Sequence, residues 1–135
     1  MADVKIYVEV HNFAVKDIFE SKHKSRLIAL MKKTAEKAIK DKLALGAPKD
    51  KGGKGYTLDG SLTSLAPDKA QKMLQAKCSI SISSGRGIES IAQGSVGVSI
   101  AGADKIKDGD IDATAQACVE SAMKSAVKFM SSTPP

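Results

Sequence analysis

Apolar and polar residues alternate in four segments of the chain, and a period of two is typical of strands with one buried face. The segments span residues 4–10, 56–63, 73–83 and 90–101. Within them, small hydroxyl side chains stand opposite the aliphatic positions; these are Thr57, Thr63, Ser79, Ser81, Ser95 and Ser99. The sequence therefore predicts four strands, with an apolar face and a face of hydroxyls.

A different spacing, with apolar residues three and four apart, indicates an amphipathic helix over residues 22–45. Ser21 or Ser25 is the candidate N-cap of this helix. Gly46 is expected to follow its C-terminus, because glycine readily adopts the left-handed conformation that ends many helices.

A second amphipathic helix is predicted over residues 110–131 by the same spacing. Asp108 or Asp110 is expected to cap its N-terminus, where a negative charge is favourable. Residues 131–135 are expected to fray.

The predicted order is strand, helix, three strands, helix, which favours an α+β fold within a single domain of residues 1–135. Two amphipathic helices supply enough apolar surface for one face of a sheet, so we expect a two-layer sandwich with a four-stranded, mainly antiparallel sheet. Both helices should cover the same face, which leaves the hydroxyls on the open face. Turns are predicted at 66–69 and in "SGRGIE", and a flexible loop at 47–55.

Composition narrows the classes of function. Aromatic residues make up only 4% of the 135 residues, which argues against a site that stacks on bases or sugars. No segment approaches the roughly 20 apolar residues of a membrane span, and the N-terminal residues do not form an apolar signal core. The protein is expected in the cytoplasm, or in the periplasm or medium if a leader was removed and the cysteines are bridged.

The net charge of +6 arises in the first part of the chain. Residues 1–56 hold 13 basic and 7 acidic residues, whereas the remainder holds 8 of each. Candidate residues for binding an anion or a partner are Lys32, Lys33, Lys37, Lys40, Lys49, Lys51 and Lys54. The alternative interpretation is a solvated helix face, because acids are interspersed and no arginine-rich recognition face is present.

Cys78 and Cys118 are the only cysteines, and both fall on predicted inward faces. They could form a disulfide that closes a loop of about 40 residues and stabilises the fold by about 4 kcal/mol in the chain-entropy model. Alternatively, they are two small buried thiols that never meet. We expect no metal site, because two separated cysteines with His11 and His23 in distant elements offer too few ligands.

The motifs that suggest chemistry all fail in detail. The segment "KDGDID" resembles the start of a calcium loop, but Ala113 and Val119 replace the required glycine and glutamate, so helix capping explains its acids better. The glycine-rich "DKGGKGYTLDG" leads into a strand and lacks the Lys-Ser/Thr of a phosphate loop. Neither His11 nor His23 has a spaced nucleophile or carboxylate, so both are expected to be solvated or loosely packed, and we predict neither an enzyme nor a cofactor.

Three stretches, "KTAEKAIKDKLALGAPKDKGGKGYTLDGSLTSL", "KCSISIS" and "DIDATAQACVESAMKSAV", resemble small uncharacterised bacterial α+β proteins. They are also loosely similar in layout to accessory domains of envelope lipoproteins. The resemblance covers about two thirds of the chain and involves scaffold residues, so it implies no activity. It implies that Cys78 and Cys118 correspond to paired cysteines, and hence an exported, oxidised protein.

The sequence thus favours a non-enzymatic, monomeric binding or accessory protein. It would offer its polar sheet face or an exposed sheet edge to another protein. The alternative is a weak, non-specific binder of nucleic acid or of an anionic surface, which would use the basic first helix and the following loop.

Overall fold

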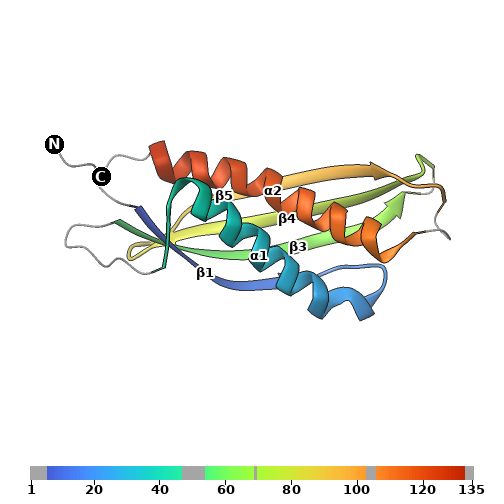
Figure 1. Ribbon diagram of the computed structural model, residues 1–135, viewed down its shortest axis with the longest axis horizontal. Helices are drawn as coiled ribbons and strands as arrows, with labels where there is room; N and C mark the ends of the chain where they lie inside the picture. Colours follow the sequence, from blue (N-terminus) through green and yellow to red (C-terminus); the bar gives the residue numbers. More distant parts are fainter. Residues whose placement is uncertain (1–5, 47–53, 69, 103–105, 133–135) are drawn as a thin grey trace.

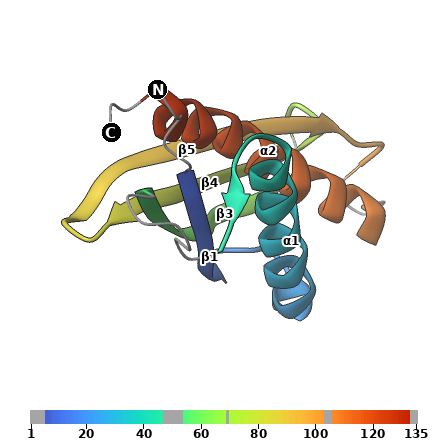
Figure 2. The same cartoon turned by 60° about the vertical axis from the view of Figure 1, so that its left-hand side comes forward.

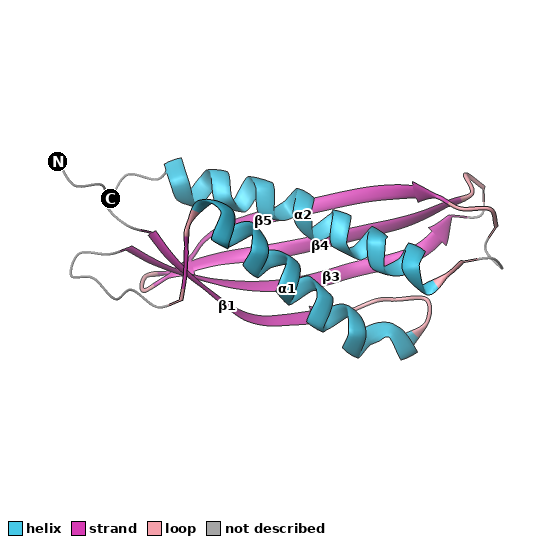
Figure 3. Cartoon of the chain, in the orientation of Figure 1, coloured by secondary structure: helices cyan, strands magenta, loops and turns pink. Residues whose placement is uncertain are grey.

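Two helices lie side by side across one face of a five-stranded sheet (Figure 1). The computed structural model describes residues 6–46, 54–68, 70–102 and 106–132. Its elements in chain order are β1 (Ile6–Val15), the 3-10 turn η1 (Ser21–His23), α1 (Lys24–Lys42), β2 (Ala44–Leu45), β3 (Lys54–Asp68), β4 (Met73–Ser84), β5 (Gly87–Ser99) and α2 (Asp108–Ser132). The predicted two-layer α+β architecture is confirmed, and Figure 3 shows the separation of helices and strands into two layers.

The sheet has the order β2-β1-β3-β4-β5 and is mixed. β3, β4 and β5 form an antiparallel meander, whereas β1 is parallel to both of its neighbours. The prediction of four mainly antiparallel strands was wrong in two details, because the sheet has five strands and is mixed. The chain leaves β1 and returns through α1, and such a crossover connection joins parallel strands.

The fifth strand, β2, consists of residues that the helical spacing had assigned to the end of the first helix. α1 ends at Lys42 because Leu43 adopts an extended conformation, with φ −132° and ψ −178°. Ala44 and Leu45 then pair in parallel with β1. Gly46 has φ +116° and donates its N–H to the Val8 carbonyl oxygen at 2.8 Å, so it ends β2 and not the helix.

The N-terminus of α1 also differs from the prediction, because neither Ser21 nor Ser25 is its N-cap. His23 holds that position and its side chain makes no capping hydrogen bond. Ser21 instead begins η1, whose turn precedes α1 directly.

A bulge explains why β1 is longer than residues 4–10. The register against β3 shifts between Val10 and Phe13, so the buried side shifts from Val8 to Phe13 and Val15. The backbone N–H of Asn12 at the bulge donates to Asp59 Oδ1 at 3.2 Å. This change of phase hides the second half of the strand from a search for strict alternation.

β3 likewise continues beyond its predicted end, because Pro67 pairs with Leu74 inside the ladder. The turn to β4 comes at residues 70–72 instead of 66–69. Asp68 Oδ1 accepts hydrogen bonds from the N–H groups of Ala70 and Gln71 at 3.0 and 3.3 Å, which stabilises this turn. Of the predicted 47–55 loop, residues 47–53 lie outside the described residues and the last two belong to β3. Of the predicted 131–135 tail, the first two residues belong to α2 and residues 133–135 lie outside the described residues.

The core fills the space between the helices and the sheet, as Figure 2 shows from a second side. Its largest fully buried side chains are Tyr56, Leu27, Met31, Ile39, Leu58, Leu62, Leu65, Leu74, Ile80, Ile82, Ile111 and Met123. Both helices and every strand from β1 to β5 except β2 contribute buried residues, so the helices and the sheet share one core.

The other face of the sheet carries the hydroxyl side chains that the sequence placed there. Thr63, Ser95 and Ser99 are exposed, and the remaining three are partly exposed. This face is less uniform than predicted, because Ile88 and Ile91 are 67% and 56% exposed and stand opposite Ser83 and Ser81.

Candidate functional site

The outer edge of β5 pairs with no other strand in the described part of the chain. β5 spans 13 residues, Gly87–Ser99, and pairs on one side with β4. An unpaired edge presents a row of backbone N–H and C=O groups that can pair with another strand. Proteins commonly protect such edges with lysine or proline, and β5 contains neither.

Two exposed isoleucines lie at one end of this edge. Ile88 and Ile91 belong to β5, and their partners across the ladder are serines of β4. Next to them along the open face, Gln93 and Ser95 are exposed. We call Ile88, Ile91, Gln93 and Ser95 the β5 edge surface. Ile91 lies at the same parity as Ser95 and Ser99, so alternation alone places it on this face, whereas Ile88 reaches the face only through the bulge at the start of β5.

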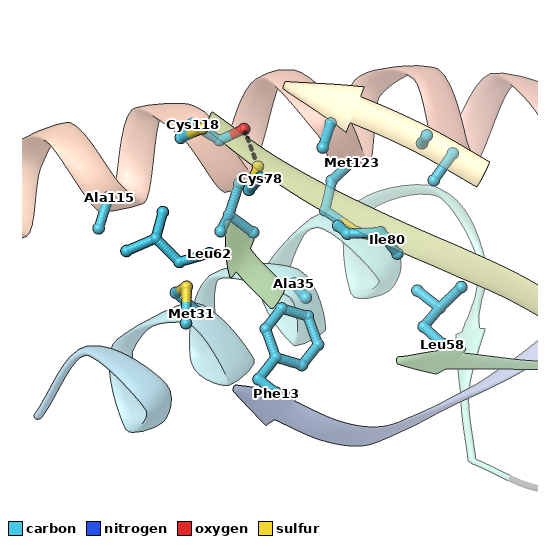
Figure 4. Close-up of a cluster of buried hydrophobic side chains, with 14 of the residues drawn as sticks. Phe13, Met31, Ala35, Leu58, Leu62, Cys78, Ile80, Ala115, Cys118 and Met123 are labelled. Carbon is cyan, nitrogen blue, oxygen red and sulfur yellow. Dashed lines mark hydrogen bonds between the residues drawn. The ribbon is translucent and has the colours of Figure 1, made fainter. Parts of the chain in front are cut away.

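The two cysteines meet in the core where α2 crosses β4 and β5 (Figure 4). Cys78 of β4 donates its thiol to the Cys118 carbonyl oxygen at 3.2 Å. Cys118 of α2 donates its thiol to the Gly94 carbonyl oxygen at 3.4 Å. Both are buried free thiols, so the structure brings together the two residues of the predicted disulfide, and the bond itself stays a prediction.

Hydrogen bonding makes the two thiols unequal acids. Interaction with the Cys118 side chain lowers the pKa of the Cys78 thiol, although burial acts against this effect. The hydrogen bond to Cys78, together with burial, raises the pKa of the Cys118 thiol. The two thiols therefore titrate as one coupled pair. A thiolate beside a second cysteine is the arrangement from which oxidation forms a disulfide.

The basic residues of the predicted anion site are divided between different surroundings. Lys33 and Lys37 line a groove between α1 and α2, whereas Lys32 and Lys40 lie outside it. Lys54 begins β3. Lys49 and Lys51 are outside the described residues.

Three lysines that the sequence had not singled out line the same groove: Lys42, Lys124 and Lys128. The helical spacing had placed the two α2 lysines on a face toward water. Only the packing of α1 beside α2 brings the five lysines together, and no motif in the sequence signals it.

The histidines differ from each other in their surroundings. His11 is exposed, as expected, and its Nε2 lies 3.4 Å from Glu9 Oε2. His23 is only 2% exposed, so the expectation of a solvated or loosely packed side chain was wrong for this residue. Its Nε2 lies 3.6 Å from Glu20 Oε1, in the turn that precedes α1.

The acids of "KDGDID" hold the start of α2 in place. Asp108 and Asp110 both lie inside the first turn of α2, so neither is the predicted N-cap, and Asp110 Oδ2 instead accepts the backbone N–H of Lys107, the residue before the helix, at 3.1 Å. Arg26 of α1 lies 2.9 Å from Asp112 and 4.0 Å from Asp108. Among the described residues, no group of three or more His, Cys, Asp or Glu side chains is placed to hold a metal ion.

Comparison with known proteins finds the fold in bacterial proteins and no match to a protein-family model or a curated protein. The PelC dodecamer from Paraburkholderia phytofirmans is similar with a TM-score of 0.55 at 10% identity, over 91% of this chain and 89% of that one. Protein XCC0632 of the DUF330 family from Xanthomonas campestris gives 0.54 at 8% identity, over 93% and 82%. A minor lipoprotein from Acinetobacter baumannii gives 0.53 at 7% identity, over 93% and 91%.

These likenesses define the class of fold. The chain shares its fold with bacterial α+β proteins that include a minor lipoprotein, as its sequence resemblance indicated. The names of the three similar proteins state no enzymatic activity. In the described part of the chain, no helix combines the length and the apolar character needed to cross a bilayer.

Proposed function

We propose that this chain is a non-enzymatic accessory protein of the bacterial envelope that binds another protein through the free edge of β5. The observation that carries the proposal is a 13-residue edge strand without lysine or proline, which itself contains two exposed isoleucines. The fold that this chain shares with lipoprotein-like proteins supports the assignment to the envelope.

The physical basis of this binding mode is strand addition. An extended segment of the partner would pair with the backbone of β5, and those hydrogen bonds would supply affinity. Side chains of the added strand would alternate between the two faces, so every second one would meet the open face. Ile88 and Ile91 would give apolar side chains of the partner a place to bury surface.

Site-specific photo-cross-linking in bacterial cells tests the proposal. A photo-reactive residue at Ile91 is expected to give a discrete adduct with a second protein. The same residue at Lys24, which is exposed at the start of α1, is expected to give none. Ser95→Lys should abolish the adduct at Ile91, because a charged lysine on an edge strand disfavours pairing with another strand.

Two outcomes would overturn the proposal. One is the absence of any adduct at Ile91, or the same set of adducts at Ile91 and Lys24. The other is an adduct with twice the mass of the chain, which would identify a second copy in place of a different protein and would also correct the expected monomer.

A further inference from the structure

A second surface lies on the opposite layer of the molecule, between the two helices. It is a groove of about 1000 Å³ lined by residues 30–42 of α1 and 116–131 of α2. At a rise of 1.5 Å per residue, these segments are about 18 and 22 Å long. The two helices run in the same general direction in Figure 1 and cross obliquely in Figure 2, and both contribute lining residues.

The floor of this groove is apolar. Leu30 and Ala38 of α1 and Val127 of α2 line it and are partly exposed, while Met123 lies beneath them, fully buried. A row of aliphatic side chains between two helices can take the apolar side of a third element.

The rims of the groove are positively charged. Five exposed lysines line it: Lys33, Lys37, Lys42, Lys124 and Lys128. Two acids, Asp41 and Glu120, line it as well, which leaves a formal charge of +3. Within the described part of the chain, none of the five lysines has an ion-pair partner within 4.0 Å.

The spacing of the lysines adds to this imbalance. Lys33 and Lys37 are four residues apart on α1, and Lys124 and Lys128 are four apart on α2. Like charges at this spacing are neighbours on a helix surface and repel each other, although Asp41 and Glu120 stand at the same spacing from Lys37 and Lys124. A negatively charged occupant would relieve the repulsion on both rims at once.

We infer that this groove binds an acidic amphipathic helix of a partner protein. Apolar side chains of that helix, at spacings of three and four, would lie on the floor, and its flanking carboxylates would meet the lysines on both rims. The length of the groove corresponds to about 12–15 helical residues. The groove is partly open to solvent, so it fits one face of a helix better than a small ligand, which proteins usually enclose.

The same features disfavour nucleic acid as the occupant. Phosphates would meet the lysines but would gain nothing from an aliphatic floor, and single-stranded bases bind mainly by stacking on aromatic side chains. This inference is independent of the proposed role of β5, because the two surfaces belong to different layers of the sandwich.

The test uses a synthetic 14-residue helical peptide with leucine at positions i, i+3, i+4, i+7 and i+11 and mainly glutamate elsewhere. Its binding to the full chain is measured by fluorescence anisotropy at low and at physiological salt. The double variant Lys37→Glu/Lys124→Glu is expected to weaken binding by about 10-fold or more, since it reverses one charge on each rim.

The matched control is Lys32→Glu/Lys40→Glu. It changes the net charge of the protein by the same amount, and both residues lie on α1 outside the groove. It is expected to weaken binding by about 2-fold or less, because distant exposed charges are screened at physiological salt. Thermal unfolding confirms that both variants are folded. Ser95→Lys on β5 should leave peptide binding unchanged, which separates this test from that of the proposed function.

Three results would overturn the inference. The first is that the peptide does not bind at low salt, and the second is that the two double variants weaken its binding equally. The third is that a single-stranded oligonucleotide, or vesicles of anionic phospholipid, bind more weakly to the groove variant than to the control variant, whereas the peptide does not. The last result would assign the groove to a different class of ligand.

Discussion

Gly94 determines how closely α2 approaches the sheet. A Cβ at this position would overlap the Cys118 carbonyl oxygen and would lie 3.1 Å from the backbone nitrogen of Ala122. Both obstacles are helix backbone, which cannot move aside as the end of a flexible side chain can. The absence of a side chain at Gly94 therefore lets the helix lie directly on β5, where the thiol of Cys118 reaches a carbonyl of the sheet.

We predict that Gly94→Ala destabilises the fold. α2 would have to move outward along its contact with β4 and β5, and overpacking of this kind costs about 1–3 kcal/mol. The free energy of unfolding, measured by urea denaturation, should fall by that amount. Gly85→Ala is the control, because a Cβ there has no neighbour within 4 Å, and it should change stability by less than about 0.5 kcal/mol. Equal effects of the two substitutions would refute the close approach at Gly94.

At the scale of the element, the start of α2 depends on one carboxylate. Asp110→Ala removes the hydrogen bond to the backbone N–H of Lys107 and should lower the free energy of unfolding by about 1 kcal/mol. Asp108→Ala removes the same charge from the same helical turn, but its carboxylate is 73% exposed and lies 4.0 Å from Arg26. That substitution should cost little, since exposed ion pairs contribute at most about 1 kcal/mol and often much less. Thermal unfolding of the two variants distinguishes the two effects. Loss of the hydrogen bond destabilises only the Asp110 variant, whereas loss of a negative charge from the first turn would destabilise both variants equally.

The existence and type of the long elements could be predicted from the sequence, because each shows an uninterrupted period. β4 is the clearest example, with buried residues at alternate positions from Leu74 to Ile82. The features that were not predicted occur where the strand alternation changes phase, or where a helical spacing continues into a strand. Leu43 fits the helical stripe although its backbone is extended, and the bulge at Asn12 moves the buried side of β1 to the other parity.

At the scale of the whole molecule, Cys78 and Cys118 connect the sheet with the helix layer. We predict that treatment with a thiol oxidant such as diamide joins them and raises the melting temperature. The bond would close a loop between residues 40 positions apart and would stabilise the fold by about 4 kcal/mol in the chain-entropy model. A thiol count on denatured, unreduced protein should fall from two to zero.

The control for this prediction is Cys78→Ala, which cannot form the bond and should show no oxidant-dependent change in melting temperature. An oxidised wild-type protein that keeps two titratable thiols would contradict the prediction.

The candidate surfaces could be predicted only in part, since both depend on tertiary contacts. The lysines of α1 are visible in the sequence, but Lys124 and Lys128 join Lys33 and Lys37 only because the helices pack side by side. The free edge depends on strand order, and the sequence does not state which strand is last. β1 inserts beside β3, and this leaves β5 at the edge of the sheet. The arrangement depends on pairing between strands that are far apart in the sequence.

This insertion of β1 has a consequence for synthesis. Ile6 pairs with Lys54, 48 positions later, whereas β3, β4 and β5 are joined by short turns. Closing the longer loop costs more entropy, so the meander can form before β1 finds its place. β1 is therefore synthesised well before β3, and its sheet edge has no partner until β3 has been made.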